Sequence, residues 1–185
     1  MLDATDESFE QDVLDRSRER PVVVDFWAEW CGPCRALGPV LEREVEALDG
    51  AVELVKVDTD ANPALAAGYS IRSIPAVKAF RDGHVVSEFV GALPPERVRD
   101  FLADLVKPPA AEALLEEDGV DPAVAAALKA GDVEEALKLL LERVPAAGPE
   151  ERERIREQMV GLFGDLGQEH PTAVEYRRRL ATALY

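Results

Sequence analysis

Hydrophobic and polar positions divide the chain into two regions with different predicted secondary structure. The first region, up to residue 107, combines strand-like and helix-like periodicity. Apolar runs rich in β-branched residues predict buried strands, and the Asp82-Gly83 pair predicts a hairpin turn. The strands are expected over 21–28, 52–58 and both arms of 76–90, and the helices over 9–19, 34–48, 63–69 and 94–106. This order predicts an α/β fold in which helices flank a central mixed sheet.

Capping signals indicate where two of the helices begin. Ser8 followed by Gln11 is a capping-box pattern, so the first helix is expected to be capped by the Ser8 hydroxyl. Asp121 followed by Pro122 predicts a helix start in the second region, because Asp is a favoured cap and Pro is favoured in the first turn.

The second region contains only helical patterns. Adjacent prolines end the last helix of the first region and predict a short linker over 108–111. Beyond it, apolar residues recur at helical spacing in roughly four segments, which predicts a small all-α region over 112–185. The last of these helices is expected from about Thr172, with an apolar face formed by Val174, Leu180 and Leu184.

Composition and charge exclude several classes of function. With 47% hydrophobic and 31% charged residues, the chain has the composition of a globular protein. Its net charge of −16 opposes binding to nucleic acid and to anionic membranes. No apolar run approaches the roughly 20 residues that cross a bilayer, and the acidic N-terminus lacks the apolar part of a secretory signal. We therefore expect a cytoplasmic protein without nucleic-acid or membrane partners.

Both cysteines of the chain lie in one CGPC motif, at Cys31 and Cys34. A closed zinc site needs four ligands, and the motif supplies two; the remaining candidates, His84 and His170, lie in different regions. A purely structural disulfide that closes so small a loop would remove only about 2 kcal/mol of unfolded-state entropy, and such bonds are uncommon in the cytoplasm. A redox-active dithiol remains as the interpretation that fits best.

The surroundings of the motif favour this redox interpretation. A buried strand passes into a helix here, so Cys31 is expected at the first helical turn, where unpaired N–H groups and the helix dipole stabilise a thiolate. Cys34 follows one turn later, on the same face and expected to lie deeper, and can attack a mixed disulfide between Cys31 and a substrate. Gly32 lets a partner backbone approach, and Pro33 stiffens the bridge. We expect Cys31–Cys34 to be a redox-active disulfide.

Asp25 is the second indication of chemistry. A carboxylate inside the apolar run VVVDFW is anomalous, because buried Asp is rare unless it is paired. From this strand its side chain could lie beneath the sulfurs, where burial would raise its pKa and allow it to accept the proton of Cys34. The alternative is a solvent-exposed Asp at a strand end. Lys56, in the equally apolar ELVKVD, is the expected charge partner of Asp25. Trp30 is expected to shape the substrate surface, and Trp27 to pack.

The segment VVVDFWAEWCGPCRALGPVLE closely resembles the active-site segment of thioredoxins, and WCGPC is specific within the superfamily of CxxC oxidoreductases. The likeness continues through VKVDTDANPALAAGYSIRSIPAVKAFRDGHVV and FVGALPPERVRDFL, over about residues 5–106. It implies a thioredoxin fold whose first strand is reduced to a few residues around Leu2–Ala4. It also implies a cis peptide at Ile74–Pro75 that faces the motif. A substrate groove would then be formed by Trp30, Ile74, Pro75 and the Gly91–Ala92 turn.

The tail carries a second resemblance. GDVEEALKLLLERVP is similar to a tetratricopeptide-type helix, and REQMVGLFGDLGQEHPTAVEYRRRLATALY resembles the C-terminal end of chaperedoxins, thioredoxin–tetratricopeptide fusions of the YbbN/CnoX type. The resemblance implies a tail that holds unfolding clients without ATP and passes them to a chaperonin. Because the tail is shorter than the two tandem helical units usual in that family, we expect it to dock on the first region or to pair between chains. The alternative is that its apolar faces only pack its own helices together.

Two functions follow from these residues and resemblances. The first is a thiol–disulfide oxidoreductase, a protein-disulfide reductase acting through Cys31 and Cys34, with a helical protein-binding tail. The second is a chaperedoxin-type holdase or co-chaperone whose redox activity is secondary. The implied partners are disulfide-containing or unfolding client proteins, an electron donor of the thioredoxin-reductase type and a chaperonin. No cofactor and no metal is implied.

Overall fold

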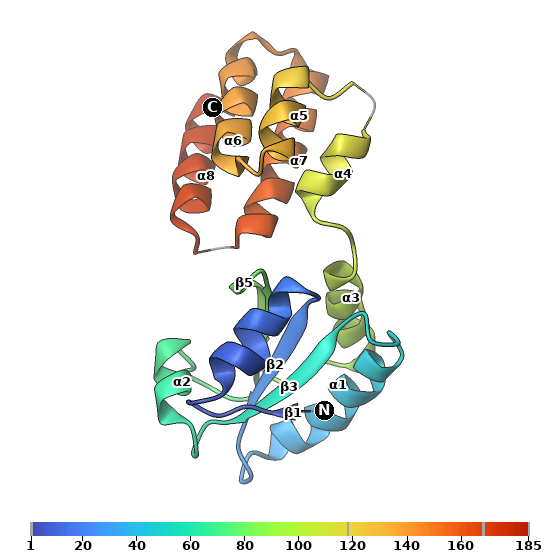
Figure 1. Ribbon diagram of the computed structural model, residues 1–185, viewed down its shortest axis with the longest axis vertical. Coiled ribbons are helices and arrows are strands. Elements are labelled where there is room, and N and C mark those ends of the chain that lie inside the picture. Colours follow the sequence, from blue (N-terminus) through green and yellow to red (C-terminus); the bar gives the residue numbers. More distant parts are fainter. Residues whose placement is uncertain (1, 118, 168, 185) are drawn as a thin grey trace. The chain divides into compact units, whose positions relative to one another are not determined.

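The computed structural model describes residues 2–117, 119–167 and 169–184 and divides the chain into two compact units between Lys107 and Pro108 (Figure 1). Each unit has a hydrophobic core of its own. Gln168 and Tyr185, which belong to the segment that resembles chaperedoxins, lie outside the described residues. Within the described ranges, no helix combines the length and the apolar character that crossing a membrane requires.

The N-terminal unit contains a five-stranded mixed sheet, in the order β1-β3-β2-β4-β5 among the described residues. Its strands are β1 (Leu2–Asp3), β2 (Val22–Trp27), β3 (Glu53–Asp58), β4 (Ala76–Arg81) and β5 (His84–Val90). β3 runs parallel to β1 and β2, whereas β4 runs antiparallel to β2 and β5. The apolar run around Asp25 forms β2, the central strand, because a strand covered on both faces can bury consecutive side chains, here those of residues 22–26. The predicted α/β fold is confirmed.

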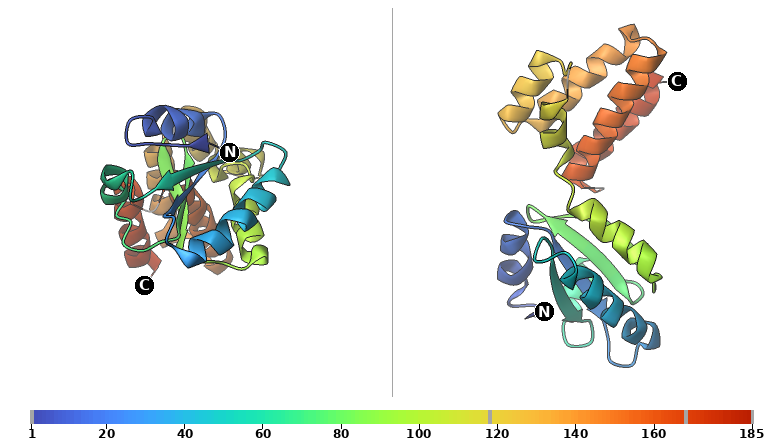
Figure 2. Two further views of the ribbon diagram at one scale, coloured as in Figure 1. Left: turned by 90° about the horizontal axis from the view of Figure 1, so that it is seen from below. Right: turned by 90° about the vertical axis from the view of Figure 1, so that its right-hand side faces the viewer.

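Helices cover both faces of this sheet (Figure 2). They are the π-helical segment η1 (Glu10–Asp15), the 3₁₀ turn η2 (Arg16–Arg18), α1 (Gly32–Glu46), α2 (Pro63–Gly68) and α3 (Pro95–Leu105). α1 and α3 share one hydrophobic cluster with Val23, while η1 shares the opposite cluster with Val22 and Val24. Because strand side chains alternate between faces, Asp25 lies on the same face as Val23, beneath α1 and α3.

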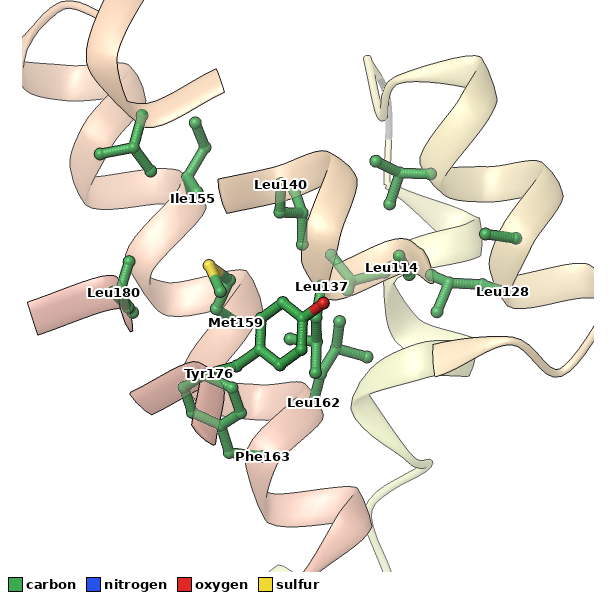
Figure 3. Packing of buried hydrophobic residues seen from close by; sticks show 14 of the residues in the cluster. Leu114, Leu128, Leu137, Leu140, Ile155, Met159, Leu162, Phe163, Tyr176 and Leu180 are labelled. Carbon is green, nitrogen blue, oxygen red and sulfur yellow. The ribbon is translucent and has the colours of Figure 1, made fainter. Parts of the chain in front are cut away.

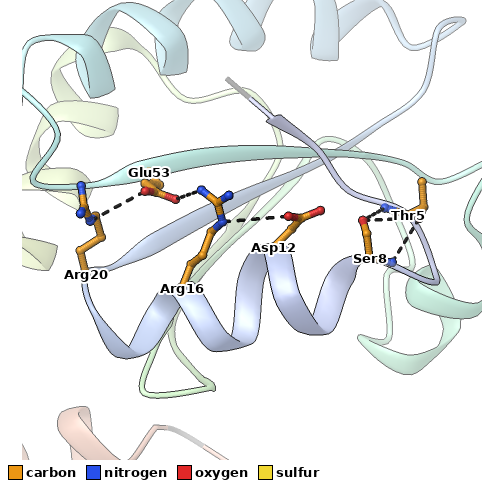
Figure 4. Close-up of polar contacts among 6 residues, drawn as sticks. All are labelled: Thr5, Ser8, Asp12, Arg16, Arg20 and Glu53. Carbon is orange, nitrogen blue, oxygen red and sulfur yellow. Dashed lines mark hydrogen bonds and ion pairs between the residues drawn. The ribbon is translucent and has the colours of Figure 1, made fainter.

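The first helical segment is capped at Thr5, so the predicted cap at Ser8 is wrong. The backbone N–H of Thr5 donates to Ser8 Oγ at 3.1 Å, and the backbone N–H of Ser8 donates to Thr5 Oγ1 at 3.3 Å (Figure 4). Thr5 and Ser8 are both good capping residues, and the apolar spacing alone did not choose between them. The other end of this segment is tied to β3, because Arg16 Nη1 and Arg20 Nε lie 3.2 and 3.8 Å from the carboxylate oxygens of Glu53.

The described residues of the C-terminal unit form helices joined by turns and short connections. It contains α4 (Ala110–Glu116), α5 (Pro122–Lys129), α6 (Val133–Arg143), the 3₁₀ turn η3 (Val144–Ala146), α7 (Pro149–Leu166) and α8 (Pro171–Leu184). One hydrophobic core joins these helices, with Leu137, Met159 and Tyr176 among its buried members (Figure 3). Val174 is 52% exposed, so its predicted place on the apolar face of the last helix is wrong; Ala173 and Tyr176 point into the core instead.

The structure adds α4 to the roughly four helices predicted and shortens the linker. The backbone N–H groups of Ala110 and Ala111 donate to Asp165 Oδ1 and Oδ2 at 3.0 and 2.8 Å. α4 also packs closely against α7 at Gly161, where an added Cβ would lie only 2.8 Å from the Ala110 Cβ. This cap comes from a residue 55 positions away, so nothing in the sequence around Pro109 indicates that a helix begins at once.

Candidate active site

The two cysteines lie where β2 leads into α1, and they form a disulfide bond. Cys31 is the N-cap of α1, and its Sγ accepts a hydrogen bond from the backbone N–H of Cys34 at 3.2 Å. The Cys31 sulfur therefore lies at the positive end of the helix, which stabilises a thiolate once the bond is reduced. Both cysteines are 3% exposed, so the prediction that Cys34 lies deeper is wrong for this disulfide-bonded form; both pack in one cluster with Ala28.

Asp25 is buried beneath α1, at 1% exposure, which excludes the alternative of an exposed strand-end carboxylate. Sheet pairing places it beside Lys56 of β3 and Val77 of β4. Its Oδ1 atom is buried and has no hydrogen-bond partner among the described residues. Burial raises the pKa of Asp25 from 3.8 to about 6, while the positive charge of Lys56 lowers this pKa and the negative charge of Glu42 raises it. Asp25 therefore changes protonation state close to neutral pH.

Lys56 acts on Asp25 through its charge, and its ion pair is with a residue that the sequence reasoning missed. Lys56 Nζ lies 3.4 Å from Glu42 Oε1 and 5.0 Å from the ring centroid of Trp27. Glu42 follows Cys34 by eight positions along α1, a spacing that puts both residues on the same side of a helix. That spacing is the signal that could have identified Glu42.

The cis-proline turn and the turn after β5 meet beside the disulfide. The Ile74–Pro75 peptide bond is cis, and Ile74 packs against the cluster that contains both cysteines. The backbone N–H of Gly91 donates to the carbonyl oxygen of Pro75 at 2.8 Å, which brings the Gly91–Ala92 turn to the same place. Gly91 has φ 93°, in the left-handed region that favours glycine. The structure thus brings together the main-chain segments of the expected groove.

Trp30, the residue before Cys31, adds an exposed aromatic ring to the motif. Its side chain is 68% exposed, and its Nε1 donates to Asp60 Oδ2 at 2.7 Å, so the indole is held although it faces solvent. Gly32 and Pro33 are exposed next to it, whereas Trp27 is partly buried against the disulfide. Asp60 was not predicted, because its role depends on a contact between loops that are far apart in sequence.

No group of three or more His, Cys, Asp or Glu side chains is arranged to hold a metal ion in the part of the chain that the structure describes. What the site offers instead is a dithiol–disulfide pair, a buried carboxylate that titrates near neutral pH and, next to them, the exposed Trp30, Gly32 and Pro33. Together these groups can exchange a disulfide with an extended peptide segment and manage the accompanying proton.

Comparison with known proteins gives matches to both units. A thioredoxin family model matches residues 1–104, and a tetratricopeptide-repeat model matches residues 110–185. Thioredoxin C-2 of Corynebacterium nephridii is 47% identical over 102 residues, which cover 55% of this chain and 93% of that protein. Thioredoxin 1 of a Nostoc species is 49% identical over 90 residues, covering 49% and 82%. A thioredoxin of Streptomyces clavuligerus is 51% identical over 94 residues, covering 51% and 85%.

Proposed function

Since the chain belongs to the thioredoxin family and is a thioredoxin-type disulfide oxidoreductase, we propose that it reduces disulfide bonds in other proteins, with Cys31 as the attacking thiol. The observation that carries this assignment is the position of Cys31 as the N-cap of α1. A sulfur at that position gains from the helix dipole and from unpaired N–H groups, so Cys31 rather than Cys34 is the more acidic thiol.

The reaction proceeds in two exchanges. The Cys31 thiolate attacks one sulfur of the substrate disulfide, and the other substrate sulfur leaves as a thiolate. Cys34 then attacks the Cys31 sulfur, which releases the second substrate thiol and forms the Cys31–Cys34 disulfide seen in the structure. Two electrons pass from the dithiol to the substrate, so a reductant of the thioredoxin-reductase type must restore the dithiol after each turnover.

Asp25 acts as the proton acceptor for the second exchange. Cys34 must lose its proton before it can attack, and it is buried, so solvent has little access to it. Asp25 lies under the helix that carries Cys34, and with a pKa of about 6 it is ionised at neutral pH while remaining basic enough to take a proton. Lys56 tunes this carboxylate through its charge.

The substrate segment binds in the groove around the disulfide. Trp30 provides an exposed aromatic wall, and Ile74 provides an apolar edge next to the cysteines, followed by the cis-linked Pro75. The Gly91–Ala92 turn, with Gly91 half-buried and Ala92 exposed, offers main chain next to Pro75. Gly32 and Pro33 present little side-chain bulk, so a backbone can approach the Cys31 sulfur.

Reduction of insulin disulfides tests the redox proposal. The intact chain is expected to reduce insulin with a dithiol donor present, and Cys31→Ser to abolish this turnover. Cys34→Ser is expected to accumulate a mixed disulfide on Cys31, because the resolving thiol is gone. Unchanged turnover in Cys31→Ser would contradict the proposal.

We propose in addition that the C-terminal unit binds protein partners, and the tetratricopeptide-repeat match over residues 110–185 supports this. Deletion of residues 108–185 is expected to leave insulin reduction intact, because the N-terminal unit has its own cores. The deletion is also expected to remove any suppression of client aggregation. Equal suppression by the truncated and full-length chains would exclude the tail as the client site.

The same match favours a second candidate, a chaperedoxin-type holdase or co-chaperone. If holding clients is the main activity, Cys31→Ser should still suppress aggregation and should still be captured by a chaperonin. If reduction is the main activity, the same variant should lose its cellular role while keeping its fold. Complementation of a deletion strain with Cys31→Ser therefore separates the two functions.

A further inference from the structure

The ammonium group of Lys56 is held in place by α1 as well as by its own strand. Its Nζ lies 3.4 Å from Glu42 Oε1 and 5.0 Å from the Trp27 ring centroid. A Cβ built at Gly38 would lie 3.7 Å from the same atom. Gly38 and Glu42 are one helical turn apart on α1. The Lys56 side chain therefore passes over Gly38, where no side chain blocks it, and its ammonium group reaches the carboxylate of Glu42.

Lys56 thus lies between two carboxylates, the buried one of Asp25 and the more exposed one of Glu42. Asp25 is 1% exposed, the Lys56 side chain 18% and the Glu42 side chain 40%. Asp25 and Lys56 are paired residues of adjacent strands, which puts both side chains on the face covered by α1. Glu42 therefore competes with Asp25 for the charge of Lys56.

Lys56 and Glu42 are the charged side chains that act most strongly on the Asp25 carboxylate, as the other groups around it show. β4 contributes the apolar Val77 at the paired position. α3 turns Val98 and Leu102 toward this face, and its Arg99 pairs with Glu44 instead. From β3, Asp58 lies on the same face two residues beyond Lys56, where it accepts a hydrogen bond from the backbone N–H of Asp60. From α1, besides Glu42, the two cysteines also face this region, and both are held in the disulfide.

We propose that Glu42 is a positioning residue for proton transfer at the active site, because its pairing with Lys56 fixes the ammonium group and draws part of its charge away from Asp25. The inference rests on the proposed role of Asp25 as the proton acceptor for Cys34. Without Glu42, the ammonium acts on Asp25 alone and stabilises its ionised form. Asp25 then becomes a weaker base, and the pH range over which it takes the proton moves toward acid.

Titration of the Asp25 carboxyl carbon by NMR tests the proposal in the full-length, disulfide-bonded chain. Glu42→Gln is expected to move the midpoint to lower pH by about half a pH unit, the size of a partly screened charge interaction. Glu42→Asp, which keeps the charge, should restore most of the original midpoint. Glu46→Gln removes the same charge from an exposed position one turn further along α1 and should leave the midpoint unchanged. An unmoved midpoint in Glu42→Gln would overturn the proposal.

The Lys56→Met background shows whether Glu42 acts through Lys56. The shift caused by Glu42→Gln should become clearly smaller in that background, because no ammonium remains to be positioned. An equal shift in both backgrounds would mean that Glu42 acts only by its own charge, which refutes the positioning role. An unchanged far-ultraviolet circular dichroism spectrum would verify folding, whereas tryptophan fluorescence would not serve, because Lys56 Nζ lies 5.0 Å from the Trp27 ring centroid and Lys56→Met changes that contact directly.

The pH profile of the resolving step connects the titration to catalysis. Each protein's rate at pH 5.5 is expressed as a fraction of its own plateau rate at high pH. This fraction should be about twice as large for Glu42→Gln as for the unsubstituted chain, because the titration midpoint lies about half a pH unit lower in the variant. A shifted carboxyl titration with an unshifted rate profile would overturn the proposed role in proton transfer. Failure of the proposed function itself would show differently, as absence of insulin reduction by the unsubstituted chain.

Discussion

Replacement of Asp25 by Asn is expected to stabilise the N-terminal unit at neutral pH. Asn keeps the size of the side chain but cannot ionise, so it removes the cost of a charge that is buried at 1% exposure with an unpartnered Oδ1 among the described residues. Folding raises the pKa of Asp25 from 3.8 to about 6, so the folded protein binds this proton more tightly than the unfolded chain does. The stability linked to Asp25 is therefore complete below about pH 4 and is lost as the pH rises through about 6.

The size of the effect follows from the same pKa difference. A change from 3.8 to about 6 spans about 2.2 pH units, and each pH unit corresponds to about 1.36 kcal/mol. Above pH 6 to 7, Asp25→Asn should therefore unfold with a free energy about 3 kcal/mol larger than that of the unsubstituted chain. Below pH 4 the two proteins should be nearly equal, because Asp25 is then neutral in both the folded and the unfolded state.

Urea denaturation followed by tryptophan fluorescence measures this difference. Trp27 and Trp30 are the two tryptophans of the chain and both belong to the N-terminal unit, so their signal reports the unfolding of that unit. The experiment is a series between pH 4 and pH 8, with Asp104→Asn as the matched control at an exposed position of α3. The control should change the unfolding free energy by less than about 0.5 kcal/mol at every pH.

Two results would refute the reasoning. A stability gain that is the same at pH 4 and pH 8 would show that Asn improves packing or hydrogen bonding and that ionisation has no part in it. A gain below about 1 kcal/mol at pH 8 would show that the Asp25 charge is solvated in the folded protein. Slower disulfide exchange by the same variant at pH 7 is expected alongside the gain, because the group that destabilises the fold is also the proposed base.

Three further predictions concern packing and charge outside the redox pair. Glu44→Gln should destabilise the N-terminal unit at pH 7 and by less at pH 3, since hydrogen bonds from Arg99 and Arg43 hold the pKa of Glu44 below 4.5 and its contribution is lost as the pH falls; the same urea series, extended to pH 3, measures this. Gly161→Ala should lower the thermal midpoint of the C-terminal unit in circular dichroism despite the better helix propensity of Ala, because its Cβ would lie 2.8 Å from the Ala110 Cβ; a raised midpoint would exclude the clash. Asp165→Asn should cost that unit about 1 kcal/mol by weakening the cap of α4, with faster amide exchange at residues 110 and 111 as its signature.

The chemistry of the site could be predicted from sequence because it is local along the chain. Cys31 and Cys34 are three residues apart, and Asp25 precedes Cys31 by six, so one strand and the start of one helix are enough to place them. Lys56 could be predicted for a related reason, because a charged residue inside a second buried strand is expected to lie in the sheet next to the strand that carries Asp25. The cis bond at Ile74–Pro75 was implied by the resemblance alone, and the structure confirms it.

The partners of these residues could not be predicted, because they are chosen by packing between distant segments. Glu42 meets Lys56 only when α1 lies over β3. Trp30 meets Asp60 only when the loop after β3 lies next to the motif. The cap that Asp165 provides to α4 has the same origin, and it is why the linker was predicted too long.

Among the described residues of the N-terminal unit, two carboxylates are buried, those of Glu44 and Asp25. Comparing them shows that a buried charge indicates function only when it is left unpaired. Glu44 is 7% exposed and accepts hydrogen bonds from two arginines, so its pKa falls and its ionised form stabilises the fold. Asp25 is 1% exposed and its pKa rises, because burial disfavours the charged form and the positive charge of Lys56, which is paired with Glu42, offsets this only in part. A carboxylate that costs about 3 kcal/mol at neutral pH is not retained for stability, since Asn would fill the same space without that cost. Its presence beneath the cysteines is explained by the reaction, which needs a base that a better-paired carboxylate could not supply.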